Sequence, residues 1–337
     1  MAAPKKVGRQ TVAFVNPPVV LATATVVGAK EGQGPLGWTF DKVVEDPYCG
    51  EDSWEKAERR LLQEALEKTL AKANLKPQDI DYLLAGDLLN QIISANFVAR
   101  ALAVPFLGLY GACSTIYEGM ALGAMLIDGG FAQNVLIGSS SHYATAERQY
   151  RFPTEQGSQR VPTAQWTVTG AGALLLAASG TGPRVTYATV GRVVDFGSGD
   201  PYNMGAAMAP AAADTIIHHF TDTQRRAEDY DLILTGDLGV YGKDLLEQLM
   251  LEYGHDISAR HNDCGILIFD REKQDVHAGG SGCGCPAVVT CGFIIQQLRD
   301  RKLHRVLGIG TGALLSPITT GQGETIPTIG HAVVLEA

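Results

Sequence analysis

Apolar and polar positions along the chain follow two different periods. Residues 53–79 carry leucine or alanine at positions 61, 62, 65, 66 and 70, which is the spacing of a helix that buries one face. Shorter apolar runs rich in valine, leucine and isoleucine, such as 134–141, are typical of buried strands. The alternation of such strands with helices predicts an α/β fold whose parallel sheets are covered by helices on both faces.

This pattern of strands and helices occurs twice. "DYLLAGDLL" (81–89) returns as "DLILTGDLG" (231–239), and both apolar runs follow a helix-like segment. A helix that starts at Cys113 leads to the next strand, and a glycine-rich turn, "GGSGCGCP" (279–286), opens the equivalent helix. Two unrelated α/β segments could share a strand pattern, but the matching order favours a duplication. The later strand pairs are 134–141 with 305–313 and 169–179 with 329–337.

A duplication divides the chain into two halves, 1–180 and 181–337, related by a pseudo-twofold axis. Residues 139–165 are predicted to form a flap in the first half. Ligands of α/β folds bind beyond the carboxyl ends of strands, where helix N-termini present unpaired N–H groups. Because Cys113 and the turn around Gly284 occupy equivalent ends of their sheets, we expect one shared central site.

The composition excludes several classes of protein. The chain has 337 residues and a formal net charge of −9, which argues against a nucleic-acid partner because no basic stripe could contact phosphates. No apolar run reaches the ~20 residues that cross a bilayer, and no signal peptide is evident. The six cysteines suggest reduced thiols. We expect a soluble protein of a cytoplasm-like compartment, with no direct membrane span.

Several cysteine and glycine motifs have competing interpretations. Cys113 starts a helix and has two interpretations. In the first, the helix N-terminus lowers its thiol pKa, and the thiol contacts a ligand or works as a nucleophile; in the second, it is an inert buried thiol. Cys283 and Cys285 have the wrong spacing for the usual zinc pair, so no metal site is expected. "GIGTGA" (308–313) lacks the helix and acid of a dinucleotide site and predicts a close backbone approach to the central site.

Two of these motifs resemble a known superfamily. "GACS" (111–114) and "TGAGALLLAAS" (169–179) resemble the nucleophile turn and closing strand of the thiolase superfamily, in its ketoacyl-acyl carrier protein synthase III-like branch. More narrowly, the chain is similar to a family of stage V sporulation proteins with this fold, which implies α/β/α/β/α layers. That similarity is carried in order by "AGDLLNQ", "GACST", "SSHYATAERQYRFPTEQG", "ATVGRVVDFG", "AMAPAAADTI", "HNDCG", "AGGSGC" and "GTGALLSP".

The residues that a condensing enzyme of this branch needs beside its cysteine are missing. A histidine and an asparagine normally position the second carbonyl and stabilise oxyanions. The resemblance places the histidine at Gly236, followed by Asp237, and the asparagine within 279–286, where neither type occurs. Loss of one oxyanion donor costs ~10²–10³ in rate. We therefore expect a pseudo-enzyme, since His142 and His277 could substitute only if the fold brought them within reach.

The resemblance also implies a ligand and partners. It implies binding of dipicolinic acid (pyridine-2,6-dicarboxylate), with no resident cofactor and with calcium carried on the ligand. The protein would support uptake into the forespore, as a homodimer at the periphery of the inner membrane, together with membrane proteins of the same sporulation stage. Two alternatives stay open: an acyltransferase that uses Cys113, and a scaffold with a vestigial pocket.

A small flat dianion needs hydrogen-bond donors, cations and an aromatic wall. Polar residues of suitable types follow the strand 134–141, and Asp237 follows the strand symmetric to the one before Asp87. Asp87, with Asn90 and Gln91, is expected at the dimer interface or at the pocket, and the interface is the favoured interpretation. No catalytic and no metal-binding residue is expected. The residues expected to bind the ligand are Cys113, Ser139, Ser140, His142, Arg148, Asp237, Ser281 and Gly282.

Overall fold

The strands form two half-sheets with the same internal order. The computed structural model describes residues 5–150 and 160–337. Each strand of one half-sheet has a counterpart at the same place in the other, which confirms the duplication. The first half-sheet has the order β5 (Phe106–Gly108), β4 (Tyr82–Gly86), β6 (Asn134–Ser141), β8 (Gly170–Ala177), β2 (Val19–Gly28). The second has the order β11 (His261–Asp263), β10 (Leu232–Thr235), β13 (Arg305–Ala313), β14 (Thr328–Glu336), β9 (Arg184–Thr189).

The sheets are mixed rather than parallel. β4 and β10 each run parallel to both of their neighbours. β8 and β14 are antiparallel to both of theirs, so the expectation of parallel sheets is wrong for these strands. The error has a simple cause: every residue of β8 is buried, and a strand covered on both faces is apolar throughout whichever way its neighbours run.

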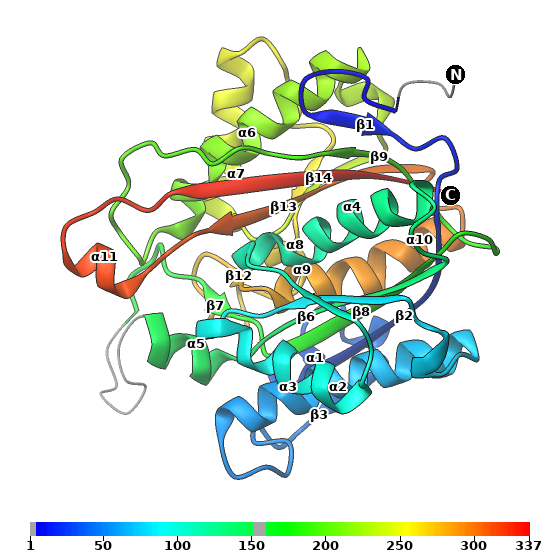
Figure 1. Ribbon diagram of the computed structural model, residues 1–337. Coiled ribbons are helices and arrows are strands. Elements are labelled where there is room, and N and C mark those ends of the chain that lie inside the picture. The colour runs from blue at the N-terminus through cyan, green and yellow to red at the C-terminus, as the bar shows by residue number, and fades with distance from the viewer. Residues whose placement is uncertain (1–4, 151–159) are drawn as a thin grey trace.

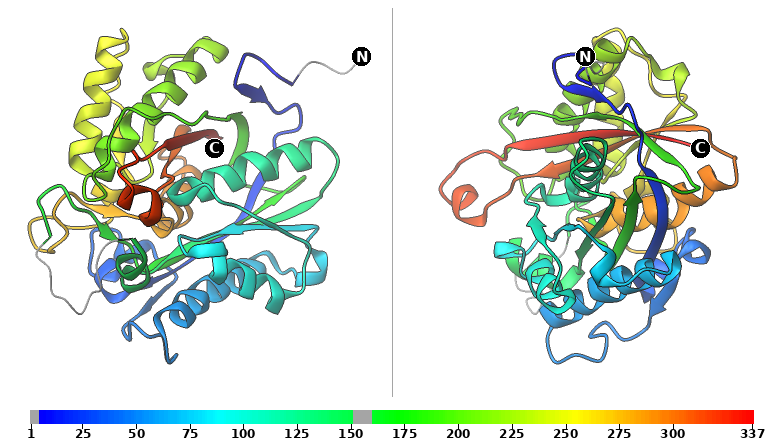
Figure 2. Two further views of the ribbon diagram at one scale, coloured as in Figure 1. Left: turned by 60° about the vertical axis from the view of Figure 1, so that its left-hand side comes forward. Right: turned by 45° about the vertical axis from the view of Figure 1, so that its right-hand side comes forward.

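Helices form three layers around the two half-sheets (Figure 1), and the two further views show the same layering (Figure 2). The resulting α/β/α/β/α arrangement is the one expected. The outer helices are α2 (Trp54–Ala73) and α3 (Ile93–Leu102) on the first half-sheet, and α6 (Met204–Thr223) and α7 (Gly239–Glu252) on the second. The middle layer contains α4 (Thr115–Asp128), α9 (Gly284–Val288), a π-helical turn (Val289–Ile294) and α10 (Ile295–Arg299).

The sequence explains the outer helix α2. Its first turn is capped by the Ser53 hydroxyl, which accepts the N–H of Lys56, and the helix ends at Asn74 in the left-handed conformation. The apolar positions between 61 and 70 are all buried against the first half-sheet. The helix expected over 53–79 is therefore confirmed, with its last residues in a turn.

The two half-sheets are joined by little backbone pairing. One residue pair, Val19 with Arg184, connects β2 to β9. The core between the half-sheets is continuous and takes buried side chains from both halves of the chain. At its centre the Tyr117 hydroxyl of α4 bonds the Thr290 hydroxyl at 2.8 Å. Side-chain packing in the middle layer therefore holds the halves together.

Short elements complete the fold. β1 pairs with β9, β3 with β2, and β7 with β12. α5 is a helix within the stretch expected as a flap; residues 151–159 of that stretch lie outside the described residues. These elements are β1 (Thr11–Ala13), α1 (Ala29–Gly32), β3 (Lys42–Val44), α5 (Tyr143–Tyr150), β7 (Trp166–Thr167), α8 (Cys264–Leu267), β12 (Gly280–Ser281) and α11 (Pro317–Gly321).

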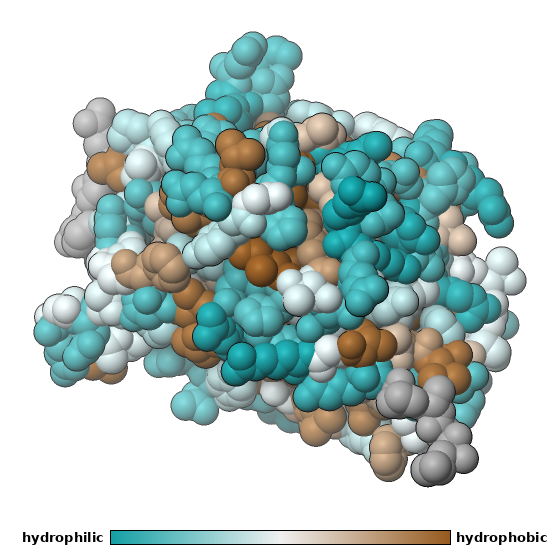
Figure 3. Space-filling view, turned by 90° about the horizontal axis from the view of Figure 1, so that it is seen from above, coloured by the Kyte–Doolittle hydropathy of each residue, from teal (hydrophilic) through white to brown (hydrophobic). Residues whose placement is uncertain are grey.

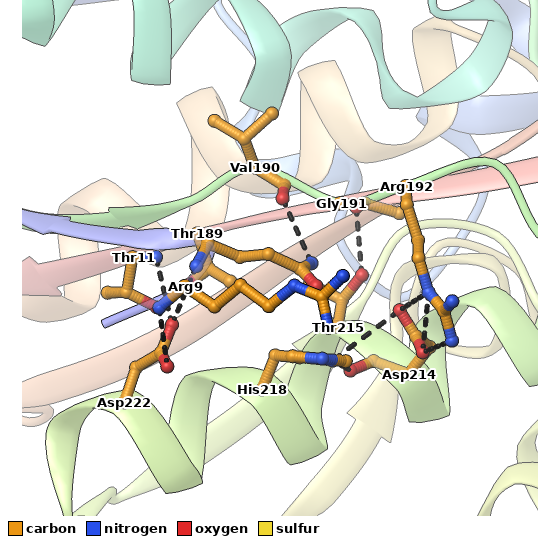
Figure 4. Close-up of polar contacts among 12 residues, drawn as sticks. Arg9, Thr11, Thr189, Val190, Gly191, Arg192, Asp214, Thr215, His218 and Asp222 are labelled. Atoms are coloured by element: carbon orange, nitrogen blue, oxygen red, sulfur yellow. Dashed lines mark hydrogen bonds and ion pairs between the residues drawn. The ribbon is translucent and has the colours of Figure 1, made fainter.

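The segment around β1 is tied to α6 by one carboxylate. Asp222 accepts the backbone N–H groups of three consecutive residues, Arg9, Gln10 and Thr11, at 2.9 to 3.0 Å (Figure 4). Earlier on α6, the Asp214 carboxylate accepts hydrogen bonds from the Nε and Nη2 atoms of the exposed Arg192. These contacts are structural, and they lie away from the cavity described below.

The molecular surface is mainly hydrophilic on the face seen from above, where apolar residues gather only in small separate patches (Figure 3). Across residues 5–150 and 160–337, no helix has the length and apolar character required to span a bilayer.

Candidate functional site

Cys113 lies on a short turn at the N-terminus of the central helix α4. Residues 112–114 form a single 3₁₀ turn after β5, and Ala112 adopts a left-handed conformation with φ of 49°. The Ser114 hydroxyl donates to the Gly111 carbonyl at 2.7 Å. The turn is thus fixed by its own hydrogen bonds, and it presents the thiol at the carboxyl end of the first half-sheet.

β13 packs against this turn and the start of α4 through three glycines. Gly308, Gly310 and Gly312 lie on one face of the strand, and a Cβ on Gly312 would lie 2.3 Å from the Gly111 carbonyl oxygen. A Cβ on Gly310 would lie 2.9 Å from the Ser114 carbonyl oxygen. The close backbone approach predicted for "GIGTGA" is therefore confirmed.

A cavity of about 280 Å³ opens in front of Cys113. Both halves of the chain contribute to its wall, as expected for a site on a pseudo-twofold axis. Cys113 itself is 8% exposed. The lining residues are 87–92, Tyr110, Ala112, Cys113, Ala146, Tyr150 and Thr167 from the first half, and Met204, Ser281, Gly282 and 313–315 from the second.

Asp237 lies buried beneath the thiol and holds the second-half turn in place. One carboxylate oxygen accepts the Thr311 hydroxyl at 2.8 Å. The other accepts the Ser281 hydroxyl and the Gly282 N–H, each at 3.0 Å. This carboxylate lies close enough to the Cys113 thiol to affect its ionisation. Asp237 therefore joins the two halves of the site but does not itself line the cavity.

The surroundings keep the Cys113 thiol protonated. Burial raises its pKa well above the usual value, and the Asp237 carboxylate raises it further. The Gly282 N–H acts in the opposite direction but is outweighed. The expectation that the helix N-terminus lowers the thiol pKa is therefore wrong. Burial and the neighbouring carboxylate disfavour the thiolate by more than the helix dipole favours it.

Of the other residues expected to bind a ligand, two line this cavity and four do not. Ser281 and Gly282 line it. The hydroxyl of Ser139 donates to the Cys283 carbonyl, and that of Ser140 donates to Glu58. Both serines are fully buried, so they are placed behind the site rather than in it.

His142 and Arg148 lie elsewhere on the first half. His142 borders a second cavity of about 420 Å³, and its Nε2 atom bonds the Pro47 carbonyl at 2.9 Å. Burial lowers its pKa. Arg148 forms an ion pair with Glu55 near the surface. The stretch after β6 reaches the Cys113 cavity through Ala146 and Tyr150 instead.

No histidine is among the described residues that line the cavity at the thiol. His277 bonds the Val161 carbonyl at 2.8 Å, and His142 faces the second cavity, so neither replaces the missing partner. Gly236 directly follows β10, as expected. Across residues 5–150 and 160–337, no group of three or more metal-ligating side chains occurs.

Residues that sequence reasoning placed elsewhere or missed make up much of the cavity wall. Asp87, Asn90 and Gln91, for which the interface was favoured over the pocket, line the cavity. Tyr110 and Met204 were not singled out. Residues 313–315 lie at the carboxyl end of β13, in the stretch that includes "GIGTGA", and that position is a signal for a ligand site. Met204 lies far from Cys113 in sequence and carries no such signal.

Comparison with known proteins identifies the family to which the chain belongs. A model of the stage V sporulation protein AD family matches residues 8–336. The chain belongs to that family. Stage V sporulation protein AD of Bacillus subtilis (strain 168) is 52% identical to it over 332 residues, which cover 98% of each chain.

Solved structures similar to this member of the family are enzymes of the thiolase fold. 3-Oxoacyl-[acyl-carrier-protein] synthase III from Aquifex aeolicus aligns with a TM-score of 0.58 and 14% identity, covering 95% of this chain and 100% of its own. A variant of OleA from Xanthomonas campestris aligns with a TM-score of 0.63 and 14% identity, covering 99% and 100%. These likenesses show the fold.

Proposed function

We propose that this protein binds dipicolinic acid in the cavity at Cys113 and does not catalyse condensation there. One observation carries the proposal: in a cavity that would otherwise serve a nucleophile, the thiol is buried beside the Asp237 carboxylate, and both raise its pKa so that it stays protonated. Condensation needs a thiolate and a positioned acid–base partner. Binding needs neither, and membership of a sporulation family supports that use of the site.

The wall of the cavity suits a flat aromatic acid. Ile92, Met204 and Leu314 offer apolar surface to a ring, while Asn90 and Gln91 carry amide groups that can donate to carboxylates. The described lining contains no lysine, arginine or histidine. We therefore propose that calcium, where it takes part, enters as the ligand's own chelate and neutralises its two charges.

Calorimetric titration tests the ligand directly. Dipicolinic acid, with and without calcium, is expected to give saturable one-to-one binding, whereas pyridine, which lacks both carboxylates, is expected to give none. If dipicolinic acid shows no saturation under any of these conditions, the cavity is vestigial and the scaffold interpretation replaces this one.

Replacing Cys113 by alanine is expected to weaken dipicolinate binding several-fold without preventing folding. The thiol lines the cavity, and its removal loses about 1 kcal/mol of contact, while α4 keeps the hydrogen bonds of its first turn. Calorimetry and a thermal melt measure the two effects. Unchanged affinity would show that the ligand does not touch Cys113.

The acyltransferase alternative makes a different prediction about the same cysteine. An enzyme using Cys113 would form a thioester adduct with acyl-coenzyme A. Because the thiol is protonated, we expect no adduct by intact mass measurement over a range of acyl chain lengths. A stable adduct on Cys113 would restore the enzyme interpretation.

We further propose that the protein acts as a homodimer beside other stage V sporulation A membrane proteins, supporting dipicolinate uptake at the forespore inner membrane. β5 supports the dimer: it is an edge strand of the described sheet, and its Leu107 is 46% exposed. An edge with an exposed apolar residue favours pairing with a second strand. Sedimentation of the purified protein tests the dimer.

A further inference from the structure

Two carboxyl groups, those of Asp87 and Glu58, lie near each other beside the Cys113 cavity. Asp87 follows Gly86, which pairs with Ser139 of β6, and the hydroxyl of the next residue of β6, Ser140, donates to Glu58. Asp87 follows β4, lines the cavity and accepts the N–H groups of Leu89 and Ala95 at 2.9 and 2.8 Å. Glu58 comes from α2 and is fully buried; it accepts the hydroxyls of Ser140 and Thr145 at 3.3 and 2.7 Å. Among the described residues, no cation contributes to the electrostatics of either carboxyl.

The electrostatics allow this pair one full negative charge near neutral pH. Burial and then the charge of Asp87 raise the pKa of Glu58 to about 8. Burial raises the pKa of Asp87 to about 6. At pH 7 the proton therefore stays mainly on Glu58, because two like charges in a buried site resist ionising together.

The other titratable groups that face the pair supply no positive charge. Cys283, at the start of α9, feels the charge of both carboxyls, and burial raises its pKa well above the usual value. Tyr150 of α5 feels the charge of Asp87 and has a raised pKa. Across the cavity, Asp237 lies beneath Cys113. All of these groups are neutral or negative at pH 7.

We propose that the dipicolinate dianion binds this cavity together with a proton, which is taken from solvent onto the Glu58 and Asp87 pair. The inference rests on the proposed function. An ionised Asp87 repels a bound carboxylate, whereas a protonated Asp87 donates its O–H to it. Each dianion bound therefore carries one hydrogen ion with it, and no covalent bond in the ligand changes.

The sign of the pH dependence follows from this uptake. A reaction that binds a proton is favoured as pH falls, and one proton corresponds to about a tenfold change in affinity per pH unit. Between pH 6 and pH 8 the ligand's own carboxyls stay ionised, so they contribute nothing to the measured proton uptake. Affinity for free dipicolinate is expected to fall by about tenfold or more across this range.

Calorimetry of the full chain tests the proposal. Dipicolinate is titrated at pH 6, 7 and 8, and at pH 7 in HEPES and in imidazole, whose different ionisation enthalpies reveal proton uptake. We expect uptake of about half to one proton at pH 7. The calcium chelate carries no net charge and is expected to take up markedly less.

Asp87→Asn removes the carboxyl that takes up the proton at pH 7 while keeping the shape of the side chain. It is expected to reduce both the pH dependence and the proton uptake by at least half. Glu67→Gln, at an exposed position of α2, is the control and is expected to change neither. If Asp87→Asn does not fold, the two-buffer measurement on the unmodified protein still decides.

The outcomes separate the two proposals. Absence of saturable binding at every pH overturns the proposed function. Saturable binding that has the same affinity from pH 6 to pH 8, with equal heats in both buffers, leaves the proposed function standing and overturns the proton linkage alone.

Discussion

Replacing Asp237 by asparagine is expected to make Cys113 react with iodoacetamide about tenfold faster or more at pH 8. Asparagine keeps the shape of the side chain, and its amide can donate to Thr311 while its oxygen accepts from Gly282. The negative charge beside the sulfur is lost, however. Repulsion between the carboxylate and a thiolate next to it exceeds about 1.4 kcal/mol, so its removal lowers the thiol pKa by about one unit or more. The alkylated fraction at Cys113 is followed by peptide mass.

The control for this experiment is Asp244→Asn, an exposed aspartate on α7, which is expected to leave the rate unchanged. An alkylation rate that stays the same in Asp237→Asn would show that burial alone protects the thiol. The pseudo-enzyme proposal would then lose its electrostatic part, although the missing histidine would still argue against condensation.

Replacing Gly312 by valine is expected to destabilise the protein by about 3 kcal/mol or more. The new Cβ would lie 2.3 Å from the Gly111 carbonyl oxygen, and a backbone atom cannot rotate away as a side chain can. The turn that carries Cys113 must then move away from β13. Thermal unfolding should begin roughly 5 °C lower or more, and dipicolinate binding should be lost with the geometry of the site.

Ile309→Val is the matched control in the same strand. Ile309 is buried in the outer core of the second half, and loss of one methylene costs about 0.5–1.5 kcal/mol without moving the turn. The control should therefore melt slightly earlier and keep its affinity. A Gly312→Val protein that melts normally and binds normally would contradict the role given to the glycine row.

Much of the fold could be predicted from the chain because its two halves repeat. Strands 134–141 and 305–313 match β6 and β13 residue for residue, since turn residues bound them clearly. Strand direction could not be predicted, because a strand buried on both faces has no polar side to reveal its neighbours. The left-handed Gln91 and Ile92 beside the cavity were also hidden, since neither type normally adopts that conformation.

The candidate site was predicted in its centre and less well at its edge. Cys113, Ser281 and Gly282 line the cavity, and their place was predictable because helix starts follow strand ends; their contact with a ligand stays a prediction. Ser139 and Ser140 lie behind the cavity, because they belong to a central strand covered on both faces and their hydroxyls bond Cys283 and Glu58. Glu58 belongs to a helix of the opposite layer, and no local pattern marks a single buried carboxyl within an otherwise ordinary amphipathic segment.

The single residue pair between the half-sheets has a consequence for the unfolding of the whole chain. Because the halves share one continuous core, neither can unfold while the other keeps its buried surface, and the protein should melt in one transition. A ligand held at the seam therefore stabilises both halves at once. If dipicolinate binds as proposed, a free concentration one hundred times its Kd would add about 2.7 kcal/mol to the stability of the entire fold, so ligand binding would also protect the protein against heat.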